Sequence, residues 1–381
     1  MGLLLPLVLC VLVSCCGARS VPAQTLGPLR LLSRGCNDSD VLAVADFALQ
    51  DINKDRKDGY VLSLNRVSDV WEYREASGPG SLYYLTLDVL ETSCHVLTKK
   101  SWKDCGKRLL HESVYGQCKA MFYINKPRRV LYLLAYNCTL RPVSRRQMNT
   151  MCPDCPFPTK LSSSEALQAV TESLAKFNSE SPSKQYSFVK ITRFSQQWVS
   201  GPGYFVEYLI EESPCTKSQD SICTLQLSHS EPVGLCKGSL SQNFLQKFVS
   251  VDCDFFETQA PGPGEDHSAA NQKPADLPSV EGHQQKGTNT PTETMPKGSV
   301  QNLPELDKEK PGDSQTKGSG EAFPVQLDLT TNPQGEEMDI SFLFMGPVEE
   351  KLLVLPFPKG QQHSTECPGP AQEPNSLILP P

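Results

Sequence analysis

The stretch Ser200-Gly201-Pro202-Gly203-Tyr204-Phe205-Val206-Glu207-Tyr208-Leu209-Ile210 has a counterpart 123 residues earlier in the chain. The counterpart is Ser77-Gly78-Pro79-Gly80, followed by the run Leu82-Tyr83-Tyr84-Leu85-Thr86-Leu87-Asp88-Val89. A Gly-Pro turn before an aromatic, alternating run is typical of a β-strand with one buried face. Such a repeat predicts two copies of one domain.

The cysteines repeat in the same way. Cys94, Cys105, Cys118 and Cys138 form one set, and Cys215, Cys223, Cys236 and Cys253 form a second. Twelve residues separate the two middle cysteines in both sets. The offset between the copies shrinks from 123 residues at the glycines to 115 at the last cysteines, which small loop differences explain.

Each copy is predicted to be one long helix followed by an antiparallel sheet. Residues recur at helical spacing in both copies: Val41, Val44, Ala45, Ala48, Leu49 and Ile52, then Ala166, Ala169, Val170, Ser173, Leu174 and Phe177. Asp38 or Ser39 can cap the first helix, and Gly59 lies beyond its end. Strands are expected in the first copy at residues 60–67, 82–90, 117–124 and 130–139. A helix lying across one face of a twisted antiparallel sheet gives an α+β domain.

Composition divides the chain into five parts. Residues 1–18 form a signal peptide, 36–150 the first domain, 151–160 a linker, 161–257 the second domain and 258–381 a tail. The tail holds 18 of the 31 prolines, and 18 acidic against 8 basic residues. It has too little apolar surface to offset its ordering entropy, so we expect it to be largely disordered and to add little to stability.

Three short apolar patches interrupt the tail, at residues 323–329, 340–345 and 352–357. Either they dock on the domains as strands, or they are isolated apolar segments in a disordered tail. Their sequence leaves both alternatives open.

The mature protein is predicted to be secreted. After the signal peptide no run approaches the roughly 20 apolar residues of a membrane span, so membrane insertion is not expected. Two N-glycosylation sequons, at Asn37 and Asn137, agree with this compartment, and the compartment excludes nucleic acid as a partner. Of the 15 cysteines, Cys10, Cys15 and Cys16 leave with the signal peptide, and the remaining twelve allow six disulfides.

Between the two copies lies the sequence Cys152-Pro153-Asp154-Cys155-Pro156. In an oxidising compartment, two cysteines at this spacing favour a disulfide over a zinc site, and no second pair at ligand spacing supports zinc. The prolines restrict the backbone, so the closed ring would be stiff and would present Asp154. Such a ring suits insertion into another protein's cleft; a stapled spacer is the alternative.

Taken together, the helix-then-sheet repeat, the cysteine sets, the Gly-Pro-Gly turn and the Cys-Pro-Asp-Cys-Pro linker resemble the fetuins, which contain tandem cystatin domains. The resemblance covers about residues 36–257 as domains, and the tail by cysteine placement. It implies the bridges Cys36–Cys367, Cys94–Cys105, Cys118–Cys138, Cys152–Cys155, Cys215–Cys223 and Cys236–Cys253. It also implies that the partner is a secreted astacin-type zinc metalloprotease, which favours acidic residues just after the cut.

The linker gives this inhibition a chemical rationale. A zinc protease holds its metal with three protein ligands and a water, and an incoming carboxylate can replace that water. Asp154 is such a carboxylate on a rigid ring, and rigidity lowers the ordering cost of binding. We therefore predict an inhibitory site made of Cys152, Pro153, Asp154, Cys155 and Pro156. Hairpins of the second domain, near 198–203 and 239–243, are expected to press on the cleft beside it.

A second motif, Gln197-Trp198-Val199-Ser200-Gly201, matches the Gln-x-Val-x-Gly hairpin of cystatins that block papain-like cysteine proteases. The first copy lacks it, and the Pro-Trp of the second cystatin hairpin is missing between Gly238 and Phe248. Cysteine-protease inhibition is therefore the alternative function. An inherited hairpin with no inhibitory role is a further interpretation of this motif.

The remaining features argue against other classes of protein. No Gly-x-Ser-x-Gly, His-Glu-x-x-His or phosphate loop occurs, so we expect neither an enzyme nor a cofactor nor a metal of its own. The basic residues of the first domain are predicted to form a solvated rim, and binding of a glycan or an anionic surface is the alternative. These residues are Lys99, Lys100, Lys103, Lys107, Arg108, Arg128, Arg129, Arg145 and Arg146. A non-inhibitory carrier of mineral or lipid is the third function considered. The chain is expected to act as a monomer.

Overall fold

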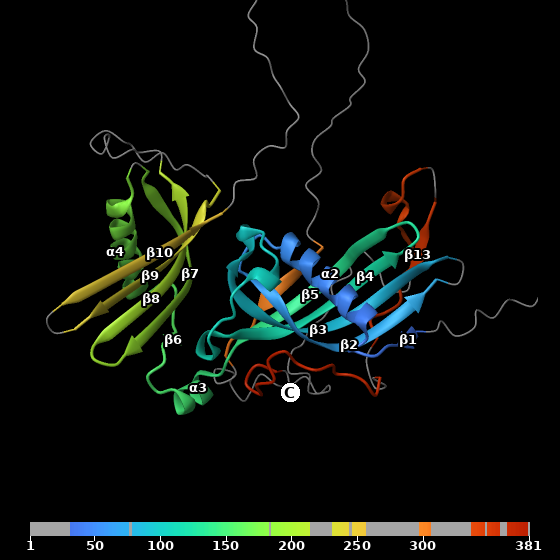
Figure 1. The fold of residues 1–381 in the computed structure, drawn as a ribbon, viewed down its shortest axis with the longest axis horizontal. Helices are drawn as coiled ribbons and strands as arrows, with labels where there is room; N and C mark the ends of the chain where they lie inside the picture. The colour runs from blue at the N-terminus through green and yellow to red at the C-terminus, as the bar shows by residue number, and fades with distance from the viewer. Residues whose placement is uncertain are drawn as a thin grey trace, which may run out of the picture.

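The computed structural model describes residues 31–75, 78–182, 184–213, 231–243, 246–256, 297–305, 337–346, 349–358 and 364–379. It contains two large, mainly antiparallel sheets, each crossed by one helix (Figure 1), and a small two-stranded sheet. The α+β fold class expected from the sequence is confirmed. The signal peptide, the patch at 323–329 and the Cys215–Cys223 pair lie outside the described residues.

The sheet of domain one contains all four predicted strands, with longer bounds. In sheet order the strands are β1 (Leu31–Ser33), β2 (Tyr60–Arg74), β3 (Gly80–His95), β4 (Val114–Asn125), β5 (Val130–Pro142) and β11 (Gly298–Asn302). Three short 3₁₀ turns join β3 to β4: η1 (Val96–Thr98), η2 (Trp102–Asp104) and η3 (Leu110–Glu112). All pairings are antiparallel except that of β11, which comes from the predicted tail and runs parallel to β5.

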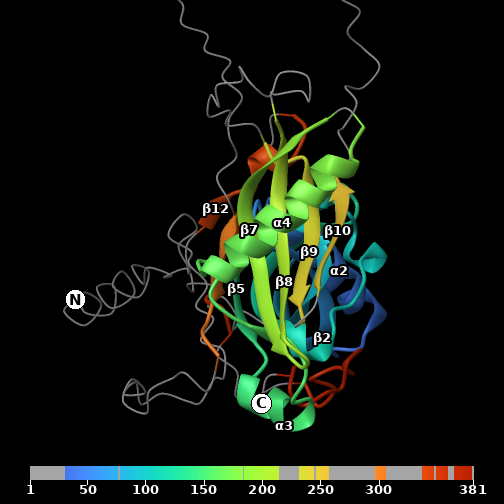
Figure 2. The ribbon, with the colours of Figure 1, turned by 90° about the vertical axis from the view of Figure 1, so that its left-hand side faces the viewer.

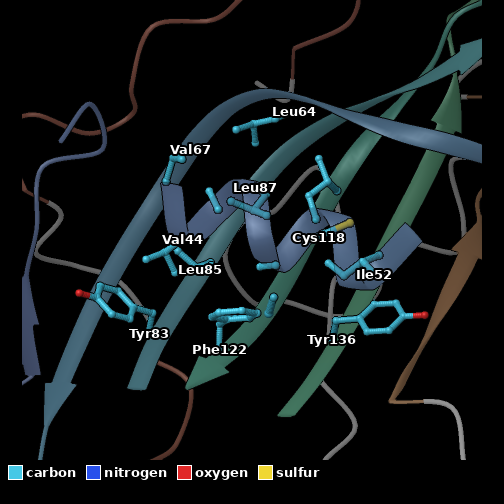
Figure 3. Packing of buried hydrophobic residues seen from close by; sticks show 14 of the residues in the cluster. Val44, Ile52, Leu64, Val67, Tyr83, Leu85, Leu87, Cys118, Phe122 and Tyr136 are labelled. Carbon is cyan, nitrogen blue, oxygen red and sulfur yellow. The ribbon is translucent and has the colours of Figure 1, made fainter. Parts of the chain in front are cut away.

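Helix α2 (Ser39–Asp55) lies across one face of this sheet because its apolar stripe recurs every three to four residues. The Asp38 carboxylate caps the helix by accepting a hydrogen bond from the Asp40 N–H at 3.0 Å. Gly59, beyond the helix, has φ +84°, a conformation that glycine adopts without strain. Figure 3 shows Val44 and Ile52 of the helix packed among residues of the sheet such as Leu85 and Phe122, all of them buried.

Domain two repeats this plan. Helix α4 (Ser164–Glu180), capped by the Ser163 hydroxyl, crosses a sheet with the order β10-β9-β8-β7-β6 (Figure 2). The strands are β6 (Phe157–Pro158), β7 (Tyr186–Trp198), β8 (Pro202–Glu212), β9 (Gly234–Gln242) and β10 (Lys247–Phe255). The core includes the fully buried Tyr208, whose hydroxyl hydrogen-bonds the Ser173 hydroxyl at 3.0 Å. This contact explains why a serine lies on the predicted apolar stripe.

The described parts of the tail pack on domain one. The strands β12 (Glu337–Asp339) and β13 (Lys351–Leu353) form a hairpin, which encloses the turn η5 (Ser341–Leu343). Ile340, Leu352 and Val354 are fully buried against the sheet face opposite α2. The Tyr84 hydroxyl donates to the Leu355 carbonyl at 3.0 Å and accepts from its N–H at 2.8 Å. The docking alternative therefore holds for the patches at 340–345 and 352–357, and the effect of these segments on stability stays a prediction.

A last tail segment is tied to domain one by the Cys36–Cys367 disulfide. Its backbone continues the connection, because Gly369 N–H donates to Val67 O and Gln372 N–H donates to Asn65 O, each at 2.9 Å. In Figure 1 this segment (red, marked C) lies at the bottom of the view next to α3 (Arg145–Met151). The C-terminal end of the chain therefore lies beside the start of the linker.

Candidate functional site

The linker forms a closed ring. Cys152 and Cys155 are bonded to each other, so neither sulfur is available as a zinc ligand. Inside the ring the Cys155 N–H donates to the Cys152 carbonyl at 3.2 Å. Pro153 and Asp154 are both exposed at its apex. The ring therefore presents one carboxylate to solvent from a tight turn.

Domain one holds the ring through α3. The Ser144 hydroxyl caps this helix by accepting from the Gln147 N–H at 3.2 Å, and the Cys152 N–H ends it by donating to Met148 O at 2.7 Å. Met148 is buried in a small apolar cluster with Tyr115, Val143 and the tail residue Ile378. Because Met148 is fixed in this cluster, the first arm of the ring is anchored to domain one and to the C-terminal segment.

Domain two holds the other arm through a short strand. Phe157 and Pro158 of β6 pair with Gln196 and Ser195 of β7, and the Thr159 N–H donates to Phe194 O at 3.1 Å. The Arg145 guanidinium lies 3.8 Å from the centre of the Phe157 ring, a cation–π contact that joins the two arms. The ring is thus fixed at both ends.

The Gln-x-Val-x-Gly hairpin meets the ring directly. The Gln197 side chain donates from Nε2 to the backbone carbonyl oxygen of Asp154 at 2.5 Å. The sequence analysis expected the hairpin tip, near 198–203, to act beside the linker, and it assigned the motif that begins at Gln197 to the alternative function. The structure brings Asp154 and Gln197 together in a single site.

Beyond Gln197 the hairpin ends in exposed apolar side chains. Trp198 and Val199 are 73% and 61% exposed, and Ser200 is also exposed. Gly201 has φ +147°, and a Cβ atom there would lie 2.2 Å from the carbonyl oxygen of Gln242 in the second hairpin. Only glycine therefore allows the two hairpins to approach this closely.

Two further aromatic side chains lie on the face of the sheet that Gln197 shares. Gln197 is opposite Gly203, Gly203 is opposite Ser241, and Ser241 is opposite Phe248, so the four residues share one face. Phe248 is 53% exposed, and Phe205, two residues after Gly203, is 37% exposed. These phenylalanines, which the sequence reasoning did not select, extend the exposed apolar surface of the site.

The two domains contact each other through buried charges. Arg108 of domain one makes two hydrogen bonds, each 3.0 Å long, to the carboxylate of Glu207 in domain two. The Tyr60 hydroxyl also donates to Glu207, and Arg108 lies over the Tyr60 ring at 4.1 Å. Burial alone would raise the pKa of Glu207, but the hydrogen bonds from Arg108 lower it overall. The prediction of a solvated rim is wrong for Arg108, whose side chain is only 3% exposed.

Additional contacts extend this interface. Arg193 of β7 donates to the Glu91 carboxylate at 2.6 Å and to the Glu112 carbonyl at 2.7 Å, and Lys190 pairs with Asp58 at 2.8 Å. Since Arg193 lies on the strand that carries Gln197, these contacts fix the orientation of the hairpin relative to domain one.

The two sequons differ in exposure. Asn37 is exposed. Asn137 lies on β5 opposite Ser299 of β11, and it is 8% exposed. Its Oδ1 accepts hydrogen bonds from the Ser299 N–H at 3.2 Å and from the Ser299 hydroxyl at 3.0 Å. Glycosylation of both residues stays a prediction, and at Asn137 a glycan has to share its site with the docked strand.

Five disulfides are present among the described residues, and they are five of the six pairs that the resemblance implies. They are Cys36–Cys367, Cys94–Cys105, Cys118–Cys138, Cys152–Cys155 and Cys236–Cys253. In the part of the chain that the structure describes, no helix has both the length and the apolar character needed to cross a membrane.

The two helix-and-sheet domains, with the paired hairpins beside a ring, define a tandem cystatin protein. A family model described as the cystatin domain matches residues 32–126 and 155–244. Fetuin-B of Homo sapiens is 66% identical over 386 residues, covering 100% of both chains. The chain therefore belongs to the fetuin-B family of tandem cystatin proteins.

Two solved structures of mouse fetuin-B also resemble this one, each at 56% sequence identity. The complex of mouse fetuin-B with crayfish astacin has a TM-score of 0.74 and covers 92% of this chain and 98% of that chain. The inhibitory complex of human meprin beta with mouse fetuin-B has a TM-score of 0.73 and covers 91% and 99%.

Proposed function

We propose that this protein is a secreted inhibitor of astacin-type zinc endopeptidases rather than an enzyme, and that the Cys152–Cys155 ring is its reactive element. The observation that carries the proposal is the exposed carboxylate of Asp154, held at the apex of a ring that both domains anchor. The complexes of mouse fetuin-B with crayfish astacin and human meprin beta support this class of target. The five disulfides agree with an oxidising, extracellular compartment.

In this proposal Asp154 is directed at the zinc of the protease. One carboxylate oxygen takes the position of the zinc-bound water, at about 2.0–2.2 Å from the metal. The disulfide and Pro153 hold the ring in a turn, so the linker does not adopt the extended pose in which proteases cut. Trp198, Val199 and the exposed Phe248 provide apolar contact surface beside the ring.

Inhibition of papain-like proteases has less support. Trp198 and Val199 are exposed at the hairpin tip, as that function requires. However, the side chain of Gln197, the first residue of the motif, is bonded to the linker, and the linker occupies the space beside the hairpin. The motif is therefore part of the ring's support.

Parallel measurements of protease inhibition and of ligand binding test the proposal. The intact protein is added to an astacin-type protease and to papain, and its binding to calcium phosphate and to fatty acid is measured in parallel. We expect stoichiometric loss of the astacin-type activity with papain unaffected. Inhibition of papain alone would establish the alternative inhibitor, and binding of mineral or lipid without inhibition would establish a carrier.

A further inference from the structure

We propose that Gln197 is a positioning residue that clamps the backbone of the ring and so aims the Asp154 carboxylate. This inference depends on the proposed function, because it describes how the same site is held. It assigns a new role to the first residue of the Gln-x-Val-x-Gly motif. In this role the Gln197 side chain binds the linker of its own chain. The motif then supports the zinc-directed ring and does not contact a cysteine protease.

The geometry of the contact supports a clamp. The Gln197 amide donates to the main-chain oxygen of Asp154, so it holds the residue without occupying the carboxylate. The carboxylate therefore stays available for a metal. Cys152 and Cys155 fix the ends of the ring to each other, but Pro153 and Asp154 are exposed at its apex. The Gln197 side chain of domain two hydrogen-bonds to this apex.

The clamp is itself well anchored. Gln197 lies near the end of β7, where it pairs with Gly203 of β8, and the preceding Gln196 pairs with Phe157 of the linker arm. Four residues earlier on the same face, Arg193 bonds to Glu91 and Glu112 of domain one. The amide of Gln197 therefore extends from a strand that is fixed to both the linker and the opposite domain.

The physical expectation follows from the strength of one hydrogen bond. A typical net contribution of about 1 kcal/mol corresponds to roughly a fivefold change in an equilibrium constant. Loss of the clamp lets the apex sample more conformations, and binding then has to order them. We expect Gln197→Ala to weaken inhibition about fivefold to tenfold while the fold is unchanged.

The chain offers a matched control one residue away. Gln196 is the same residue type on the same strand, but its side chain points to the opposite face of the sheet because strand residues alternate. Gln197→Ala, Gln197→Glu and Gln196→Ala are compared by the inhibition constant against an astacin-type protease and by thermal midpoint. Only the two Gln197 variants should weaken inhibition, and all three should unfold near the temperature of the parent. The glutamate variant is informative because an ionised carboxylate has the size of the amide but cannot donate.

A double-mutant cycle distinguishes aiming from general support. If Gln197 acts by positioning the Asp154 carboxylate, Gln197→Ala should have little further effect in the Asp154→Ala background, where no carboxylate is left to aim. An equal loss in both backgrounds would overturn the clamp, since it would show that Gln197 acts independently of Asp154. Inhibition by Gln197→Ala equal to that of the parent, with Asp154→Ala weakened, would also overturn it while leaving the proposed function intact. If Asp154→Ala inhibits as strongly as the parent, the zinc-directed role of the ring in the proposed function fails.

Discussion

The side chain of Asp154 is exposed, whereas its backbone is fixed on both sides. The disulfide closes the ring around it, and Gln197 binds its carbonyl oxygen. Its carboxylate therefore needs little ordering when a target approaches. Binding should depend strongly on this group, whereas folding should not.

We expect Asp154→Ala and Asp154→Asn to weaken inhibition of an astacin-type protease by at least tenfold, which is about 1.4 kcal/mol of binding free energy. Both variants remove the carboxylate that we propose as the zinc ligand, and the asparagine keeps the size of the side chain. The thermal midpoint should stay within about one degree, because the carboxylate packs in neither core. An unchanged inhibition constant for both variants would exclude the zinc-directed role.

His95 predicts a pH dependence of stability. It is fully buried at the domain interface, stacked on Phe256, and burial lowers its pKa from 6.5 to about 4, although Asp58 opposes the shift. His95 therefore becomes protonated near pH 6.5 in the unfolded chain, but only near pH 4 in the folded chain. The contribution of His95 to stability is complete above pH 6.5 and is lost as the pH falls toward 4, by up to about 3 kcal/mol.

Urea unfolding at pH 7 and pH 5 measures this effect. The free energy of unfolding should be lower at pH 5 in the parent protein, and the difference should shrink in His95→Gln, which does not titrate. An equal difference in both proteins would assign the pH dependence to other groups.

Single residues differed in how far the sequence could predict them. Asp154 was found because its ring is local: four consecutive residues determine it. Arg108 was misjudged, because its partner Glu207 is 99 residues away and depends on how the domains pack. The contact of Gln197 with Asp154 was missed for the same reason, since it requires β6 to pair with β7.

At the scale of elements, the ring is supported by three attachments: α3, β6 and the Gln197 side chain. Replacing Cys152 and Cys155 together by serine removes the covalent closure and leaves these three in place. Inhibition should weaken, and the linker should become a substrate, because the apex can now extend into a cleavable pose. Mass spectrometry after incubation with the protease should find a cut near Asp154. Full potency with an uncut linker would show that the attachments alone give the ring its rigidity.

The tail hairpin is a second element whose role can be measured. Leu352 is fully buried against the sheet face of domain one opposite α2. Leu352→Ala should therefore cost about 2–5 kcal/mol of docking or folding free energy. The Leu355 amide, which donates to Tyr84, should then exchange its hydrogen faster. Met345 on the same hairpin is fully exposed, and Met345→Ala should leave both quantities unchanged.

Helices and strands of the two domains were predictable because periodicity and caps are local properties, as the stripe of α2 and its Asp38 cap show. The tail strands were not. Residues 298–302 carry too few apolar side chains to indicate a strand, and β11 forms because β5 offers a free edge 162 residues away in the sequence. The patches at 340–345 and 352–357 were visible as apolar runs, but only the uncovered sheet face decides that they dock.

On the scale of the whole molecule, domain one is completed by the tail, while domain two is complete by residue 256. Truncation after Phe256 should therefore lower the thermal midpoint of domain one much more than that of domain two. It uncovers the sheet face around Tyr84 and removes β11 and the Cys36–Cys367 bridge. Replacing Cys36 and Cys367 by serine should have a smaller effect, because the docked segments keep their noncovalent contacts. Differential scanning calorimetry of the three proteins gives the order; equal midpoints would show that the docked tail contributes nothing to domain one.

The parallel pairing of β11 with β5 also sets an order of events during synthesis. Domains emerge from the ribosome with the N-terminal one first. The sheet of domain one nevertheless lacks its last strand until residue 302 has been synthesised. Cys36 likewise lacks its disulfide partner until residue 367 has been synthesised. Until then Asn137 lies on an open sheet edge, where an oligosaccharide can be transferred before Ser299 arrives. The first domain to be translated is thus the last to be completed, because its sheet and its disulfide both depend on segments near the end of the chain.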